Sequence, residues 1–255
     1  MSIDGNECEE NFYSKGKAYW EGISADIDGM LGGLSYVNQI DYESSRTFLR
    51  NQFHKLRDEN VNVEHLKVLD CGAGMFVLKL LISHLIFVFF IHYFKGIGRV
   101  SKYVLSNYFH EIHLLEQCSN FLEESYKYLE NISSMISHRY CQAIQDFEPL
   151  PNIKYDCIWN QWVIGHITDE DLKTFLDKKC SQILEPHGFI MIKDNIIAGD
   201  ESYLNEDDSS FTRTHEAYLK VLNNLDNLKL DRVIKQKNMP KDLLPVRMYI
   251  LSHKK

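Results

Sequence analysis

The sequence contains little proline and no pair of cysteines at metal-binding spacing. Its six cysteines are scattered without a Cys-x-x-Cys or Cys-x-x-His pair. This argues against a zinc ribbon or a disulfide scaffold and favours reduced thiols. Only five prolines occur in 255 residues, and no Pro/Gly/Ser-rich linker or internal repeat divides the chain. No metal site is predicted, and the length favours one α/β domain with additions.

An excess of positive charge is also missing. The chain has 28 Lys and Arg residues against 36 Asp and Glu residues, a formal charge of −8. Nucleic-acid binding through phosphates is therefore not expected. The first 17 residues are acid-rich without an apolar core, unlike a secretory signal or a transit peptide, so we expect a protein of the cytoplasm and nucleus. A charged fraction of 25% and a hydrophobic fraction of 44% exclude a disordered or collagen-like chain.

Strand and helix patterns alternate along the chain. Helices are predicted over residues 9–22 and 42–57, the second capped by Ser44 or Ser45. Further strands are predicted at 67–70, 111–115, 138–143, 155–160 and 188–193, with helices at 97–108, 120–130 and 169–184 between them. A helix at 211–225 and a hairpin of 229–233 with 247–252 complete the pattern. Alternation of this kind indicates βαβ units and a mostly parallel sheet, here closed by an antiparallel hairpin.

A glycine loop follows the first predicted strand and is interrupted. The sequence LDCGAG (69–74) is typical of a strand that ends in a nucleotide-binding turn. Such a turn needs a helix directly after it and an acid about 20 residues on, which binds ribose. Here residues 75–96 are almost wholly apolar, and Glu116 lies 44 residues after Gly72. Deleting these 22 residues restores a Gly-x-Gly-x-Gly turn (Gly72, Gly74, Gly98) and places Glu116 22 residues from Gly72.

We interpret segment 75–96 as translated non-coding sequence, either a retained intron or a gene-model error. Gly-Met-Phe at its start can be encoded with a splice-donor string, and its Phe/Ile/Val-rich end implies a T-rich stretch. The alternative is a real transmembrane or buried helix, because its length reaches the membrane threshold. Lys79, His84 and His92 argue against a span, since charge within a membrane is costly.

With the segment set aside, the motifs resemble the α-N-terminal protein methyltransferases. The matching pieces are FYSKGKAYWEGI (12–23), DGMLGGLS (28–35), SSRTFL (44–49), LDCGAG with GIGRV, IQDFEP (144–149), YDCIWNQWVIGHITDEDL (155–172), IKDN (192–195) and DDSSFTR (207–213). The resemblance implies a Rossmann-like class I methyltransferase fold, with a seven-stranded, mostly parallel sheet and an N-terminal helical extension. Residues 1–60 would form that extension and part of a peptide groove. Residues 61–255 would form the S-adenosyl-L-methionine-binding domain.

The resemblance further implies the residues that bind the methyl donor. Gly72, Arg99 and Gln161 are assigned to its methionine part, with Arg99 pairing the carboxylate as a guanidinium can. Glu116 is assigned to the ribose, although the family usually carries Asp there. The remaining donor-binding residues are expected beside the adenosine: Gln117, Cys118, Ile144 and Gln145.

The resemblance also implies the substrate, a protein that begins Xaa-Pro-Lys after removal of Met. The residues expected to hold its N-terminus are Trp20, Trp162, Asn195 and Asp208. His166 and Asp208 are the catalytic candidates, because the reacting amine must lose a proton. Asn205 stands where the family carries an additional acid, which puts recognition of the substrate lysine in question.

Other interpretations remain open at this stage. His166 could be a satisfied structural residue, Trp20 ordinary core packing, and Asp208 the cap of the following helix. A small-molecule N- or O-methyltransferase is the alternative enzyme. A product whose donor loop is disrupted by segment 75–96, and which therefore binds no donor, is the alternative without activity.

Overall fold

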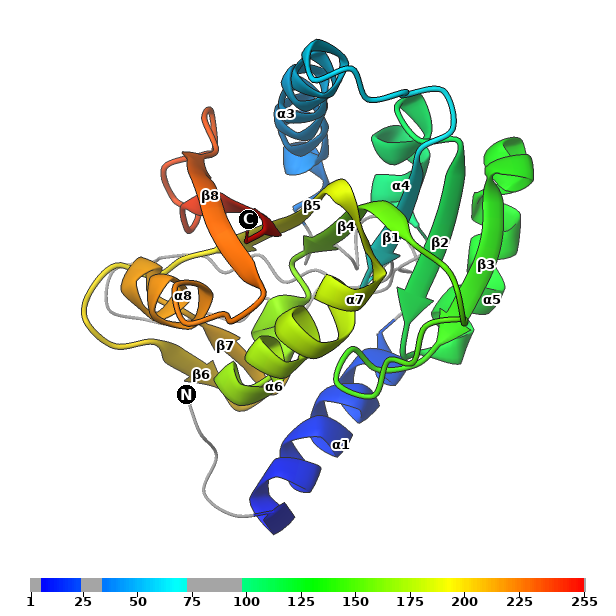
Figure 1. Cartoon of the computed structure of the whole chain (residues 1–255). Helices are drawn as coiled ribbons and strands as arrows, with labels where there is room; N and C mark the ends of the chain where they lie inside the picture. Colours follow the sequence, from blue (N-terminus) through cyan, green and yellow to red (C-terminus); the bar gives the residue numbers. More distant parts are fainter. Residues whose placement is uncertain (1–5, 24–33, 73–97, 255) are drawn as a thin grey trace.

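The computed structural model describes residues 6–23, 34–72 and 98–254. Its centre is a seven-stranded sheet with the order β3-β2-β1-β4-β5-β9-β8 (Figure 1). The strands are β1 (Lys67–Cys71), β2 (Glu111–Glu116), β3 (Ile136–Cys141), β4 (Tyr155–Gln161), β5 (Leu184–Asn195), β8 (Leu228–Lys235) and β9 (Val246–His253). The five neighbouring strands β3, β2, β1, β4 and β5 pair in parallel, whereas β9 is antiparallel to β5 and to β8. The predicted parallel sheet with an antiparallel terminal hairpin is confirmed.

Helices connect these strands and cover both faces of the sheet. They are α1 (Asn6–Gly22), α3 (Asn38–Asp58), α4 (Arg99–Tyr103), α5 (Ser119–Tyr128), α6 (Asp169–Thr174), α7 (Ser181–Ile183) and α8 (His215–Leu222). Short 3-10 helices are η1 (Ser35–Val37), η2 (Leu105–Asn107), η3 (Glu130–Met135) and η4 (Ile164–His166), and η5 (Phe175–Cys180) is a π-helical turn. A small antiparallel ladder of β6 (Tyr203–Asn205) and β7 (Ser210–Thr212) lies outside the main sheet.

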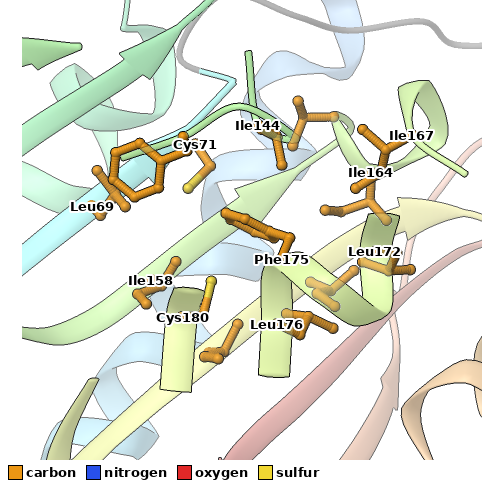
Figure 2. Packing of buried hydrophobic residues seen from close by; sticks show 14 of the residues in the cluster. Leu69, Cys71, Ile144, Ile158, Ile164, Ile167, Leu172, Phe175, Leu176 and Cys180 are labelled. Atoms are coloured by element: carbon orange, nitrogen blue, oxygen red, sulfur yellow. The ribbon is translucent and has the colours of Figure 1, made fainter. Parts of the chain in front are cut away.

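Alternate residues of each strand serve two hydrophobic cores. On one face of β4, Ile158 belongs to a buried cluster with Phe175 and Leu176 (Figure 2). On the other face, Trp159 packs against Phe48 of α3, with ring centroids 6.2 Å apart. Since the strands are buried on both sides, they read as nearly continuous apolar runs in the sequence, as parallel strands do.

Helix α1 lies across the sheet end where β1 and β2 terminate (Figure 1). The hydroxyl of Tyr13 donates to the Asp171 carboxylate and accepts the backbone N–H of Thr168 at 3.3 Å. The ring of Phe12 stacks on Phe211 of β7 at 5.1 Å. These contacts hold α1 against α6 and β7.

Four local expectations were wrong. Ser45 is a buried residue inside α3 rather than its cap, because the helix begins earlier, at Asn38. The helix expected from residue 211 begins only at His215, and β7 takes the residues before it. Thr214, whose hydroxyl accepts the N–H of Ala217 at 3.0 Å, caps that helix, so Asp208 does not. The predicted helix at 97–108 is divided into α4 and η2.

Candidate active site

A cavity lies at the carboxyl ends of the parallel strands, where ligands bind in open α/β sheets, and its empty space of about 450 Å³ includes open solvent. Helix α1 contributes part of its wall, including Gly16 and Lys17. Six of the residues predicted for the site also line it: Gly72, Glu116, Gln117, Ile144, Gln145 and His166. They come from four separate segments of the chain, so the sheet brings together residues that lie far apart in the sequence.

Gly72 follows β1 and requires the absence of a side chain. Its φ of +69° lies in the left-handed region, which residues with a Cβ rarely adopt. A Cβ built there would lie 2.5 Å from the Cβ of Val163. The backbone N–H of Gly72 donates to the carbonyl of Leu115 at 2.8 Å, which ties the turn to β2.

Glu116 ends β2 with its carboxylate beside the cavity. Its side chain is buried, and Oε1 accepts the backbone N–H of Cys118 at 2.9 Å. Burial and the neighbouring Glu116 raise the pKa of the Cys118 thiol, which therefore stays protonated. A carboxylate fixed at the end of the second strand is suited to accept ribose hydroxyls.

His166 lies on η4, where Arg213 holds the backbone. Arg213 is fully buried, and its Nη1 and Nη2 donate to the carbonyls of Ile164 and Ile167 at 2.8 and 2.6 Å. Its Nε donates to the Asp169 carboxylate at 2.8 Å. Burial raises the pKa of Asp169, whereas the positive charge of Arg213 lowers it, and the net shift is downward. Arg213 thus fixes the loop that presents His166, a role that the sequence analysis did not assign.

Trp20 lies on α1 beside His166, and Asp208 lies against the same helix, with its carbonyl oxygen 3.5 Å from a Cβ built at Gly16. The ring of Trp20 meets that of His166 edge-on, with centroids 5.5 Å apart. Asp208 is buried, and its Oδ1 accepts the hydroxyl of Ser210 at 2.7 Å. Within the described residues, neither Asp208 Oδ2 nor Trp20 Nε1 has a hydrogen-bond partner. Burial raises the pKa of Tyr19, and the negative charge of Asp208 adds to this shift. An acidic, apolar-walled corner with open polar atoms therefore borders the cavity.

Arg99 and Gln161 meet at a second place, around the buried carboxylate of Asp41. Nη1 of Arg99 donates to Asp41 Oδ2 at 2.9 Å, and Nε2 of Gln161 donates to both Asp41 oxygens at 3.0 and 2.9 Å. The ammonium of Lys193 on β5 donates to Asp41 Oδ1 and to Ser45 Oγ. Burial alone would raise the pKa of Asp41, but Lys193 and Arg99 outweigh it and lower that pKa. Among the described residues, the lining of the 450 Å³ cavity does not include Arg99 or Gln161.

Trp162 and Asn195 lie close in sequence to two members of this cluster: Trp162 directly follows Gln161, and Asn195 lies two residues after Lys193. Trp162 directly follows β4 with a φ of +56°, and its N–H donates to the carbonyl of Lys193 at 2.9 Å. Its ring lies 5.6 Å from both Arg99 Cζ and Lys193 Nζ. Asn195 ends β5 and is buried. The predicted site residues thus form two neighbouring groups at one end of the sheet.

The family described as AdoMet dependent proline di-methyltransferase matches residues 8–92 and 76–252 of the chain. This chain belongs to that family. It is 36% identical over 247 residues to N-terminal Xaa-Pro-Lys N-methyltransferase 1 of Xenopus tropicalis, covering 96% of this chain and 97% of the relative. It is 34% identical over 254 residues to alpha N-terminal protein methyltransferase 1 of Arabidopsis thaliana, covering 98% and 83%.

A solved relative supports the same family fold. A SAM-dependent methyltransferase of Leishmania major superposes with a TM-score of 0.75 at 28% identity, covering 99% of this chain and 87% of that one. A phosphoethanolamine N-methyltransferase of Haemonchus contortus superposes with a TM-score of 0.64 at 14% identity, covering 100% and 50%, and shows the fold alone. The class I methyltransferase fold is confirmed.

The methyl donor of this methyltransferase is S-adenosyl-L-methionine, and the residues present fit it. The turn at Gly72 leaves no room for a side chain next to Val163, as close approach of a ligand to the backbone requires. Glu116 supplies a buried carboxylate for the ribose, and Ile144 with Gln145 supplies an apolar and an amide wall for the adenine. Donor binding by these individual residues stays a prediction.

The interrupted glycine loop keeps its two flanks together in this methyltransferase. The hydroxyl of Ser101 on α4 donates to Asp70 of β1 at 2.6 Å, although residues 72–98 separate β1 from α4. Segment 75–96 lies outside the described residues, as do Gly74 and the glycines at 32 and 33. The two family matches overlap only at 76–92, inside this segment. Both observations are those expected of an insertion into an otherwise intact loop.

The described residues contain neither a grouped metal site nor a membrane-spanning helix. No group of three or more His, Cys, Asp or Glu side chains is placed there to hold a metal ion. No helix in the described ranges is long and apolar enough to cross a membrane. Segment 75–96, with its alternative interpretation as a transmembrane helix, lies outside those ranges.

Proposed function

We propose that the chain transfers methyl groups from S-adenosyl-L-methionine to the N-terminal α-amine of proteins that begin Xaa-Pro-Lys after Met removal. The carrying observation is that His166 lines the donor cavity with Trp20 against its ring, while the buried Asp208 lies against α1, the helix that carries Trp20. Relatives that share 34–36% identity over nearly the full chain are named for this activity.

The chemistry requires an unprotonated amine. An α-amine has a pKa of about 7.7–8.0, so much of it is protonated near neutral pH. His166, whose ring borders the cavity, is the proposed proton acceptor, and Asp208 orients the amine and stabilises its positive charge. The donor, when bound, supplies an electrophilic sulfonium methyl. Holding the nitrogen in line with that methyl supplies much of the rate, because orientation removes an entropic cost.

The substrate-binding residues are proposed from the same corner. Trp20 and Trp162 provide flat apolar walls that tolerate a cationic methylated product through cation–π contact. Asn195 is proposed to bind the substrate backbone. Asp208, with Asp207 beside it, is proposed to attract the lysine of the substrate, while Asn205 supplies an amide in place of a further acid. Lysine recognition is therefore expected to depend on fewer charges.

We also propose that segment 75–96 is dispensable for the fold and that the fully active form lacks it. The hydrogen bond between Ser101 and Asp70 supports this proposal, because it closes the loop across the insertion. The cytoplasm and nucleus remain the proposed compartments, and residues 1–60 remain the proposed substrate-groove extension.

The function is tested by the mass of a synthetic peptide that begins Ser-Pro-Lys. Incubation with the chain and S-adenosyl-L-methionine should add methyl groups, whereas the same peptide acetylated at its N-terminus should be unchanged. The Asp208→Asn variant should lose at least about tenfold in kcat/KM, the scale of one removed charge-assisted contact. Asp200→Asn is the matched control, because Asp200 is an exposed acid to which no role in substrate binding is assigned. Equal activity of both variants would contradict the role of Asp208, and methylation of metabolites but not peptides would contradict the substrate.

A further inference from the structure

The buried carboxylate of Asp41 joins four elements at the donor end of the sheet. Asp41 lies on α3, Arg99 begins α4, Gln161 ends β4 and Lys193 lies on β5. All four side chains are buried, with Lys193 fully enclosed and Asp41 1% exposed. Such a cluster is costly to bury, because each charge loses its hydration. Its charges must therefore be tightly balanced in the functional state.

The side chains in direct contact are not balanced. Arg99 and Lys193 are both within hydrogen-bond distance of Asp41, so two cations share one carboxylate. Burial lowers the pKa of Lys193, and Asp41 opposes that shift. Asp70 is a further buried acid near Arg99, and its Oδ2 accepts the hydroxyl of Ser101. The ion pair of Arg99 at hydrogen-bond distance is the one with Asp41, so a ligand carboxylate would give the guanidinium a second acid at that distance.

The orientation of Arg99 is set by α3 rather than by its own helix. Its Nη1 donates to Asn38 Oδ1 at 2.7 Å and to Asp41 Oδ2 at 2.9 Å. The ring of Tyr42 lies 5.1 Å from Arg99 Cζ and supports the guanidinium plane. A guanidinium carries five N–H donors, so these bonds at Nη1 fix the group without exhausting its capacity.

We propose that Asp41 is a positioning residue for the methyl donor. It shares its carboxylate between Lys193 and Arg99 and, with Asn38, turns the guanidinium so that its remaining donors meet the carboxylate of the donor's methionine part. This inference rests on the proposed function and deepens it. It makes helix α3 part of the donor site, so residues 38–41 couple the N-terminal extension to donor binding.

The test compares two ligands, with and without the amino-acid part whose carboxylate Arg99 would bind. S-adenosylhomocysteine carries that part, and methylthioadenosine has a methyl group on sulfur in its place. Calorimetric dissociation constants are measured for both on the full-length chain and in parallel on a variant lacking 75–96. Asp41→Asn and Asn38→Ala are the test variants. Gln39→Ala is the control, because Gln39 is exposed and bonds only to Glu43 among the described side chains.

Asp41→Asn and Asn38→Ala should each raise the dissociation constant of S-adenosylhomocysteine by about tenfold or more, as expected for a lost charge-assisted contact. The dissociation constant of methylthioadenosine should change by less than about twofold in the same variants. This ligand lacks the group that Arg99 would bind, so the substitutions should not affect its binding. Gln39→Ala should leave both ligands unchanged.

Equal weakening of both ligands, or of neither, would overturn the positioning role while the proposed function stands. If Asp41→Asn does not fold, Asn38→Ala decides, because Asn38 is half-buried and carries no charge. Failure of the unmodified chain to bind S-adenosylhomocysteine in both backgrounds would overturn donor binding and this inference together.

Discussion

Arg213 offers the sharpest test of how the fold presents the catalytic loop. The change is Arg213→Lys, which keeps the positive charge but replaces a planar fork of donors with one ammonium group. In the structure, the guanidinium bridges the carbonyls of Ile164 and Ile167 and the carboxylate of Asp169 at 2.6–2.8 Å. A lysine cannot reach all three acceptors from one position. At least one buried carbonyl of the His166 loop should therefore lose its partner.

The expected loss is large for a conservative substitution. A hydrogen bond to a charged group contributes about 1.5–3 kcal/mol, and the bond to Asp169 counts for less because that side chain is 26% exposed. We expect the variant to lose about 2–4 kcal/mol in the free energy of unfolding, or roughly 5–15 °C in Tm for a domain of this size. Below that Tm, kcat on the Ser-Pro-Lys peptide should still fall, because the His166 loop is no longer held.

The assay is thermal unfolding followed by circular dichroism, together with peptide kinetics well below the Tm of each variant. Arg232→Lys is the matched control, since Arg232 is exposed and makes one hydrogen bond of 3.2 Å to Gln52. Its stability should change by less than about 0.5 kcal/mol. A Tm for Arg213→Lys no lower than that of Arg232→Lys would refute the clamp, and a normal kcat in the folded variant would refute its role at His166.

Two further substitutions test the donor loop and its electrostatics. Burial raises the pKa of Asp70 from 3.8 to about 6. The unfolded chain therefore releases this proton at a lower pH than the folded chain does. As a result, the contribution of Asp70 to the free energy of unfolding falls as the pH rises from about 4 to about 6. Relative to Asp70→Asn, the wild type should lose up to about 3 kcal/mol over this range in urea unfolding, and a pH-independent difference would contradict the pKa shift. Gly72→Ala should weaken S-adenosylhomocysteine by tenfold or more, because a left-handed alanine costs about 1–2 kcal/mol and its Cβ would lie 2.5 Å from Val163. Gly199→Ala is the control, with a φ of +110° but open space around it, and an equal effect on binding would argue for general strain.

Much of the fold could be predicted from local patterns. The apolar runs at 67–70 and 155–160 are buried on both faces, which is why they read clearly as β1 and β4. The glycine turn at residue 72 was recognisable because its conformation excludes a side chain. Helix α8 was predicted too early, because residues 211 and 212 carry a strand pairing with β6 that no local period reveals.

The charged cluster and the loop clamp could not be predicted in the same way. Asp41 meets Lys193 across 152 residues, and Arg213 meets Ile164 across 49. A single sequence carries periodicity but not the identity of such distant partners. One signal was available: Lys193 directly follows the apolar run GFIMI (188–192) within the same predicted strand. A lysine in a fully buried strand requires a counter-charge, and that requirement alone predicts a missing acid.

The central claim is that a protein N-terminal methyltransferase site is assembled around an interrupted glycine loop. Its most direct test is the mass of a Ser-Pro-Lys peptide after incubation with S-adenosyl-L-methionine and purified chain lacking residues 75–96. The account predicts that the peptide gains one or more methyl groups on its α-amine and that the full-length chain does this more slowly. A peptide of unchanged mass in a folded preparation of the shortened chain would contradict it.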